Sequence, residues 1–206
     1  ALAKEVDWLI EGVLAAQTFG LITGSSGVGK SQLGIQAGIS LAKGEPWLGY
    51  QTTKSRVLYS SLEMGPNELG YFNEKLNGGN PVNEATEVFH YLPVGQPLSL
   101  LTTEGRQYYL SLVDEYDVFI FDTVSSSTHL SMLDEASAPG IVDFFTLLNR
   151  QYGKTILALS HDKKDAPKSG RAEDVYGHRY LIDRCSMVLR VEKAQDALLL
   201  TFPKVR

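Results

Sequence analysis

The chain has 206 residues, of which 43% are hydrophobic, and its formal charge is −5. This composition suits one well-buried α/β domain and excludes disorder as the default state. The acidic balance excludes a protein that coats nucleic acid with its whole surface, but it leaves room for a local basic patch. Neither a membrane-length apolar run nor a signal-peptide pattern is present, so we expect no membrane contact. Cys185 is the only cysteine, which excludes an internal disulfide and favours a cytoplasmic setting.

Apolar, strand-like segments alternate with helical segments along the chain. We expect strands at residues 18–23, 56–61, 87–92, 117–122 and 155–160, and helices at 31–43, 66–76, 104–115 and 134–152. Thr103 would cap the third helix. Two further strands, at 187–191 and 197–202, are predicted to form a hairpin. The pattern predicts a mostly parallel sheet flanked by helices, with a C-terminal β-hairpin, and ligands in such sheets bind at the carboxyl ends of the strands.

Residues 24–31 read Gly-Ser-Ser-Gly-Val-Gly-Lys-Ser and match G-x-x-x-x-G-K-[ST], a loop whose backbone N–H groups surround nucleotide phosphates. Lys30 would reach the β and γ phosphates, and the Ser31 hydroxyl would ligate Mg²⁺. The alternative is a glycine-rich turn that binds nothing. A predicted strand before the loop and a helix after it supply the setting that the motif requires. The predicted nucleotide-binding residues are Gly24, Ser25, Ser26, Gly27, Val28, Gly29, Lys30, Ser31 and Gln32.

Two carboxylates follow predicted strands. Asp122 ends the strand at 117–122, where phosphate-loop enzymes place an acid that holds Mg²⁺. Such an aspartate can also be a simple turn residue, but the intact phosphate loop favours the metal role, and Thr123 could share in its network. Glu63 follows the strand at 56–61 and could orient a water and accept its proton. It could equally be an acid placed to favour the dipole of the helix at 66–76.

Polar and basic residues follow the strand at 155–160. His161 could touch a γ-phosphate there, although a lone histidine is more often exposed or satisfied by the protein itself. The four histidines show no zinc-ligand spacing with the single cysteine. Positive charge is concentrated just beyond, in a segment that could also be a solvated surface loop. Its basic residues are Lys163, Lys164, Lys168 and Arg171.

With these residues in place, the chain resembles the RecA-like ATPases, and among them the hexameric replicative helicases of the DnaB and plasmid RepA types. Residues 61–64, Ser-Leu-Glu-Met, match the segment that carries the catalytic glutamate in the DnaB group. Residues 8–12 and 42–49 resemble the RepA-like group, and 159–164 are similar to its strand, histidine and lysine pattern. In that group a polar residue senses the γ-phosphate and the next loop faces the central pore. The resemblance therefore implies a sensing role for His161 and makes the four basic residues contacts for single-stranded DNA.

Residues 201–206 resemble the strand that bears a Lys-x-Arg pair in DnaB-type helicases. In that family the pair reaches into the neighbouring subunit's site and steadies the transition-state charge. Strand alternation places Lys204 and Arg206 on one face, although a frayed basic terminus would look the same. The DnaB group usually has glutamine at the position of His161, more chain after the Lys-x-Arg strand, and an amino-terminal primase-binding domain.

We therefore expect residues 1–206 to form a single RecA-like domain, or the motor domain of a longer protein, that hydrolyses ATP with Mg²⁺. The expected catalytic residues are Glu63, Lys30 and His161, with Lys204 and Arg206 supplied by an adjacent subunit, and Ser31 and Asp122 hold the metal. The expected function is the motor of a ring-forming DNA helicase, most simply a hexamer. Two alternatives stay open: a filament-forming recombination ATPase, and a nucleotide-dependent switch or loader that does not unwind DNA.

Overall fold

The computed structural model describes residues 6–61, 63–78, 89–92, 99–124, 137–161 and 179–205. In chain order its elements are β1 (Trp8–Ile10), β2 (Leu14–Ala15), β3 (Phe19–Gly24), α1 (Lys30–Lys43), β4 (Val57–Ser61), α2 (Pro66–Leu76), β5 (Phe89–Leu92), α4 (Thr103–Ser111), β6 (Val118–Asp122), α5 (Ser137–Tyr152), β7 (Thr155–His161), α6 (Arg179–Arg184), β8 (Met187–Ala194) and β9 (Ala197–Val205). The strands form a 7-stranded sheet with the order β5-β4-β6-β7-β3-β8-β9, and β1 and β2 pair separately.

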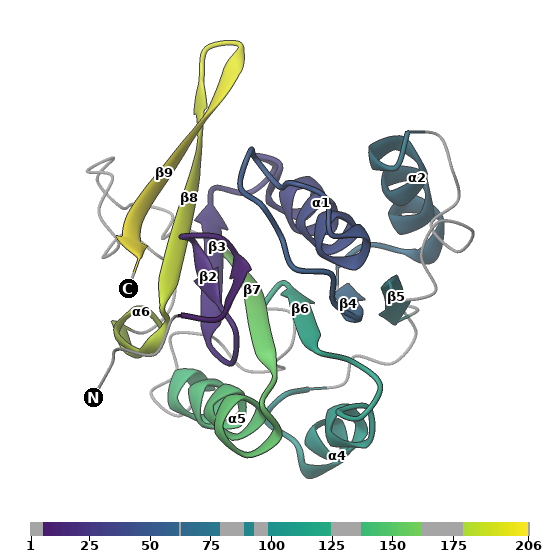
Figure 1. Cartoon of the computed structure of the whole chain (residues 1–206), viewed down its shortest axis with the longest axis vertical. Coiled ribbons are helices and arrows are strands. Elements are labelled where there is room, and N and C mark those ends of the chain that lie inside the picture. Colours follow the sequence, from purple (N-terminus) through teal and green to yellow (C-terminus); the bar gives the residue numbers. More distant parts are fainter. Residues whose placement is uncertain are drawn as a thin grey trace.

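The large sheet is parallel except at one edge. The pairs from β5 across to β8 all run parallel, whereas β9 runs antiparallel to β8. The β8–β9 hairpin extends well beyond the ends of the other strands (Figure 1). These features confirm the predicted α/β architecture and its C-terminal hairpin. A parallel sheet needs cover on both faces, which is why its strands are continuously apolar rather than alternating with polar residues.

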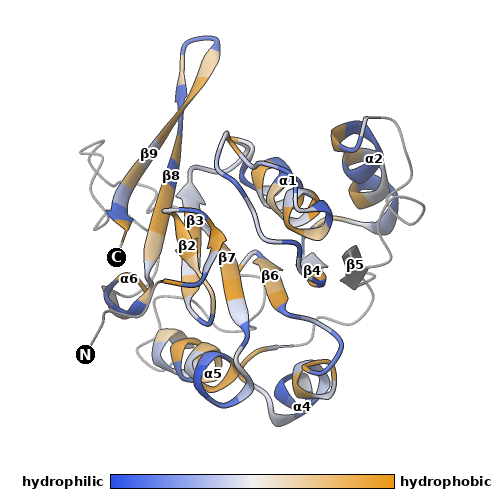
Figure 2. Ribbon diagram, in the orientation of Figure 1, coloured by the Kyte–Doolittle hydropathy of each residue, from blue (hydrophilic) through white to orange (hydrophobic). Residues whose placement is uncertain are grey.

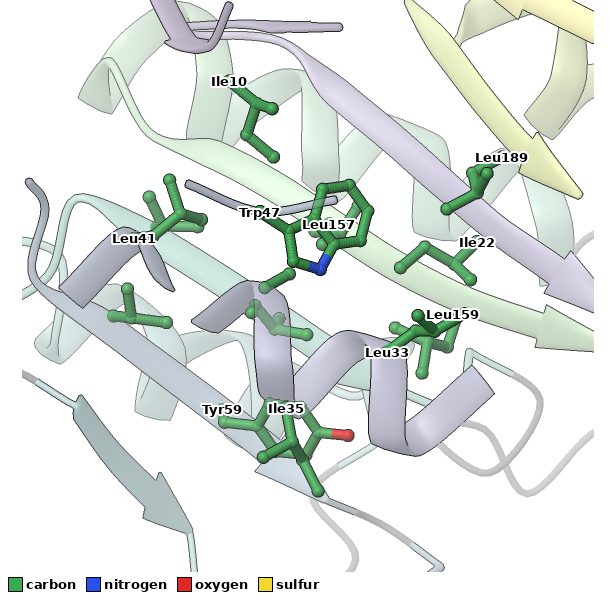
Figure 3. Packing of buried hydrophobic residues seen from close by; sticks show 14 of the residues in the cluster. Ile10, Ile22, Leu33, Ile35, Leu41, Trp47, Tyr59, Leu157, Leu159 and Leu189 are labelled. Carbon is green, nitrogen blue, oxygen red and sulfur yellow. The ribbon is translucent and has the colours of Figure 1, made fainter. Parts of the chain in front are cut away.

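Helices cover the sheet on both faces, with α1 and α2 on one side and α4 and α5 on the other (Figure 1). Alternate residues of the central strands enter two separate cores: Ile22 and Leu157 pack on the α1 side, and Leu21 and Ala158 on the α5 side. In Figure 2 the central strands are mostly in the colour of apolar residues, whereas the helices on either side carry both apolar and polar residues. On the α1 side the fully buried Trp47 fills the core beside β3 and β7 (Figure 3).

The boundaries of α4 differ from the prediction. The N-cap is Thr102 rather than Thr103, because Thr102 has the extended backbone of a cap and its hydroxyl accepts the Gly105 N–H at 3.2 Å. The helix also ends earlier than expected, at Ser111. There the backbone tightens into three-residue turns, in which Leu112 N–H donates to the Tyr109 carbonyl at 3.2 Å.

Other boundaries lie close to their predictions. α2 has the predicted limits, with Pro66 in its first turn. The part of the predicted 134–152 helix that precedes Ser137 lies outside the described residues. The β1–β2 hairpin and α6 have no counterpart among the predictions, since elements this short carry little periodic signal. In the described part of the chain, no helix combines the length and apolar character needed to cross a membrane.

Candidate nucleotide site

The phosphate loop connects β3 to α1 at the carboxyl edge of the sheet. Gly24 ends β3 between its two neighbours, aligned with His161 of β7 and Val191 of β8. A Cβ at Gly24 would lie 2.4 Å from the Val191 carbonyl oxygen, so no larger residue fits there without a backbone shift. Gly29 has φ 102° and forms the N-cap of α1, a left-handed conformation that glycine adopts without strain. The loop therefore presents the N-terminus of α1, where free backbone N–H groups favour anions.

Lys30 is buried within this loop, with 4% of its surface exposed. Its ammonium group donates to the carbonyl oxygens of Gly24 at 3.0 Å and Ser25 at 2.8 Å. The Nδ1 atom of His161 lies 3.2 Å from the same nitrogen. Two of these partners are neutral carbonyls, so a phosphate group would compete well for the ammonium, because hydrogen bonds between charged groups are about twice as strong as neutral ones.

The contacts of His161 fix which of its ring nitrogens carries the proton. A lysine ammonium can only donate, so Nδ1 accepts from Lys30 and the neutral ring carries its proton on Nε2. That nitrogen lies 3.4 Å from Oε1 of Glu63, to which it can donate. His161 thus joins the phosphate-loop lysine to the carboxylate that follows β4.

Glu63 receives a second and shorter hydrogen bond. The Thr123 hydroxyl, just beyond β6, donates to Oε1 at 2.7 Å. Thr123 is buried, whereas the Glu63 side chain is 40% exposed. A carboxylate held in this way keeps a fixed orientation while water can still reach it. Chemically, such a group can accept a proton from a water molecule beside the loop.

Asp122, the last residue of β6, is fully buried. Its Oδ2 accepts the Tyr59 hydroxyl at 2.7 Å, and its Oδ1 accepts no hydrogen bond from the described residues. Burial raises the pKa of Asp122, while Tyr59 and the nearby Ser31 hydroxyl oppose that rise by favouring the charged form. The pKa of Tyr59 is also well above its ordinary value, first through burial and then through the Asp122 charge.

This aspartate and Ser31 suit a magnesium ion. A buried carboxylate oxygen without a hydrogen-bond partner favours a nearby cation, because an unpaired charge is costly away from water. Within the described residues, no three histidine, cysteine, aspartate or glutamate side chains gather as a metal cluster. Magnesium does not require one, since it is usually held by one or two protein oxygens together with phosphates and waters. The donor set therefore fits Mg²⁺ carried with a nucleotide.

Lys204 lies apart from the phosphate loop of its own chain. It pairs with Val188 on β8, whereas the loop begins opposite Val191, so about 10 Å of strand separates the two positions. Its ammonium group donates to the Ile182 carbonyl at the end of α6. It also lies 4.0 Å from the Sγ atom of the fully buried Cys185. Five predicted residues lie outside the described residues: Lys163, Lys164, Lys168, Arg171 and Arg206.

Tyr59 lies in the strand predicted at residues 56–61, but its contact with Asp122 was not predicted. A signal was nevertheless present, because a buried tyrosine hydroxyl normally has a hydrogen-bond partner. Tyr59 precedes Ser61 by two residues on β4, and Ser61 aligns with Asp122 on β6. The register of the two strands, which no sequence pattern specifies, brings the hydroxyl to the carboxylate.

Comparison with known proteins gives a match to a family model described as an AAA domain, over residues 1–167. None of the curated proteins matches the chain. Among solved structures, a KaiC-like protein of the archaeon Pyrococcus horikoshii has a TM-score of 0.62 and 15% identity, over 96% of this chain and 83% of that one. The RadB recombinase has a TM-score of 0.61 and 16% identity, over 93% and 82%. The flagellar accessory protein FlaH of Methanocaldococcus jannaschii has a TM-score of 0.57 and 17% identity, over 93% and 80%. At these identities the structures establish a shared fold.

Proposed function

We propose that this chain, which belongs to the AAA domain family, hydrolyses ATP with Mg²⁺ in an oligomer and works as a motor on single-stranded DNA. Its fold is that of the RecA-like P-loop ATPases. The observation that carries the proposal is the hydrogen-bonded chain from Lys30 through His161 to Glu63, closed by Thr123, beside the phosphate loop. These groups come from neighbouring strands that end at the same edge of the sheet.

The phosphate loop would bind the nucleotide. Backbone N–H groups at the start of α1 point to the phosphates, and Lys30 turns from the Gly24 and Ser25 carbonyls to the β and γ oxygens. Ser31 and Asp122 would hold Mg²⁺, which when bound neutralises charge on the β and γ phosphates. Tyr59 keeps the Asp122 carboxylate oriented through its 2.7 Å hydrogen bond.

Glu63 would serve as the general base. Thr123 and His161 both donate to its Oε1, so the carboxylate is oriented before any substrate arrives. Water placed between Glu63 and the γ-phosphate attacks phosphorus, its proton passes to the carboxylate, and ADP leaves from the opposite side. Orienting the base in advance lowers the entropic cost of this in-line attack.

His161 would report the state of the nucleotide. When Lys30 turns to the phosphates, Nδ1 loses its donor, and the ring is free to reorient toward the γ-phosphate or the attacking water. Because His161 is the last residue of β7, that change acts directly on the chain that follows it. The resemblance to ring helicases gives that chain the nucleic-acid contacts, through Lys163, Lys164, Lys168 and Arg171.

Assembly would complete the site. Within the described residues β9 is the edge strand of the sheet, so a neighbouring subunit can approach Lys204 without displacing another strand, and the proposal assigns the same role to Arg206 through the Lys-x-Arg resemblance. A cation supplied in trans raises the rate of phosphoryl transfer by about 10³–10⁵ in other systems, so an isolated monomer should be nearly inactive. We propose a hexameric ring, as in the DnaB and RepA types.

The test is ATP hydrolysis measured across a range of protein concentrations, with and without single-stranded DNA, with Lys30→Ala as the blank. The proposal predicts turnover per subunit that rises steeply with assembly and is stimulated by DNA. A verified monomer that hydrolyses ATP as fast as the oligomer would refute the role of assembly.

Replacement of Lys163, Lys164, Lys168 and Arg171 by alanine should abolish DNA binding and leave nucleotide affinity intact. Unchanged DNA affinity in that variant removes the segment from the proposal.

A second candidate is a recombinase-like ATPase that forms filaments on DNA, and the likeness in fold to the RadB recombinase favours it. Both candidates use the same nucleotide chemistry and differ in assembly. Electron micrographs with ATP and single-stranded DNA separate them, since closed rings support the helicase and helical filaments support the recombinase. Tight ATP binding with negligible turnover in either assembly would instead indicate a nucleotide-dependent switch or loader.

A further inference from the structure

The β8–β9 hairpin runs alongside the phosphate loop. Val191 of β8 aligns with Gly24, the last residue of β3, and pairs with Leu200 of β9. The residues between Val191 and Leu200 therefore lie beyond the end of β3, level with the loop, where the hairpin projects from the body of the protein (Figure 1). This part of the hairpin has no role in the site described so far.

Leu198, near the tip of the hairpin, also lies close to the loop. A Cβ at Gly29 would be 3.8 Å from its Cδ1 atom. Leu198 pairs with Lys193, two residues beyond the Val191–Leu200 pair. Val191 and Leu200 both pack into the core on the α1 side. Strand alternation puts Leu198 on the same face. Its neighbour Leu199 is on the opposite face, and the two leucines are similarly exposed, at 47% and 48%.

The order of strands gives a bound nucleotide a direction. Glu63 follows β4, and Asp122 and His161 end β6 and β7; these three strands all lie on one side of β3. These residues mark the γ-phosphate end of the site. The ribose and base must then extend to the other side of the loop, where β8 and β9 lie.

We propose that Leu198 is the platform for the nucleobase, an inference that rests on the proposed nucleotide site. Stacking of a flat ring on this half-exposed leucine is favourable, because the contact removes apolar surface from water. The side chain offers no hydrogen bond, so it cannot distinguish the edge of adenine from that of guanine. The ligand class at this position is a nucleoside triphosphate, and the platform accepts adenine and guanine alike.

The experiment compares Leu198→Ser with Leu199→Ser, a matched control of equal exposure on the opposite face. Calorimetry with Mg²⁺ measures the affinity of each variant for ATP, GTP and inorganic tripolyphosphate. Leu198→Ser should bind both purine nucleotides about five- to tenfold more weakly and should bind tripolyphosphate like the wild type. Leu199→Ser should match the wild type for all three ligands, and Leu198→Met should restore most of the affinity for ATP.

Unchanged ATP affinity in Leu198→Ser overturns the proposal, and an accompanying change in oligomer mass would make the leucine a contact between copies instead. An equal loss for tripolyphosphate also overturns it, since the leucine would then act on the loop rather than on the base. The Lys30→Ala variant distinguishes a failure of the Leu198 proposal from a failure of the proposed nucleotide site. If that variant binds tripolyphosphate as well as the wild type, the phosphate site itself is wrong, whatever Leu198 does.

Discussion

Replacing Tyr59 with phenylalanine tests the hydrogen bond that orients Asp122. The hydroxyl is fully buried and donates to a carboxylate oxygen at 2.7 Å. Hydrogen bonds to charged groups contribute about 1.5–3 kcal/mol, so Tyr59→Phe should lower the free energy of unfolding by about 2 kcal/mol when Asp122 is ionised. For a chain of this length that loss corresponds to a fall in Tm of about 4–8 °C.

The loss of unfolding free energy in Tyr59→Phe should depend on pH in a defined direction. The pKa of Asp122 is already raised by burial, and the Tyr59 hydroxyl holds it down, so Tyr59→Phe raises that pKa further. In the wild type, stability falls as pH rises from the unfolded pKa of about 3.9 to the folded pKa of Asp122. In the variant the fall continues to higher pH. The destabilisation by Tyr59→Phe should therefore be larger at pH 8 than near pH 5.

Urea denaturation of both proteins at a series of pH values measures this difference. Tyr109→Phe is the matched control, since that hydroxyl is equally buried but lies 2.7 Å from the neutral Ser60 hydroxyl. Burial raises the pKa of Tyr109 to about 12, so neither partner titrates between pH 5 and 8. Its loss should be independent of pH in that range. A Tyr59→Phe loss that is equally flat would refute the coupling between Tyr59 and the Asp122 charge.

Four further substitutions have expected outcomes. Asp122→Asn should be at least as stable as the wild type at neutral pH without Mg²⁺, because it removes a buried charge, yet it should bind Mg²⁺ about 10–100-fold more weakly in a titration with nucleotide. Gly24→Ala should lose about 1–3 kcal/mol in thermal unfolding through its clash with a β8 carbonyl. Gly70→Ala, in open space on α2, should instead gain up to about 1 kcal/mol. Asp117→Asn should cost less than about 1 kcal/mol at pH 7, because its ion pair with Arg56 is exposed. The Arg56 hydrogen bond lowers the pKa of Asp117, so this cost should shrink as pH falls through that pKa; a cost that stays the same across the acidic range would contradict it.

The sequence predicts the strands and the functional residues at their ends better than it predicts the side-chain contacts between neighbouring strands. Continuous apolar runs predict β3, β6 and β7 because parallel strands covered on both faces need no polar alternation. The phosphate loop is predictable because its backbone takes up conformations that glycine adopts without strain and few other residues do. The same logic places Glu63, Asp122 and His161 at one edge, since they follow parallel strands.

Contacts that depend on register were beyond prediction. The bond from Tyr59 to Asp122 requires β4 and β6 to be adjacent and aligned at Ser61, which only packing decides. The contact of Leu198 with the loop likewise depends on how far β8 extends past β3. The predicted N-cap of α4 was wrong by one residue. Thr102 and Thr103 are equally good cap residues by sequence, and the backbone around Gly105 decides between them.

The most direct test of the account is single-turnover ATP hydrolysis by Glu63→Gln in the assembled state. Glutamine keeps the shape of the side chain and an oxygen that can accept the hydrogen bond from Thr123, but it is a poor proton acceptor. We expect ATP affinity and assembly like those of the wild type, with hydrolysis slowed by about 10²–10⁴-fold, the usual contribution of a general base. Hydrolysis at the wild-type rate would contradict the assignment of Glu63 and leave the Lys30–His161–Glu63 chain without a catalytic role.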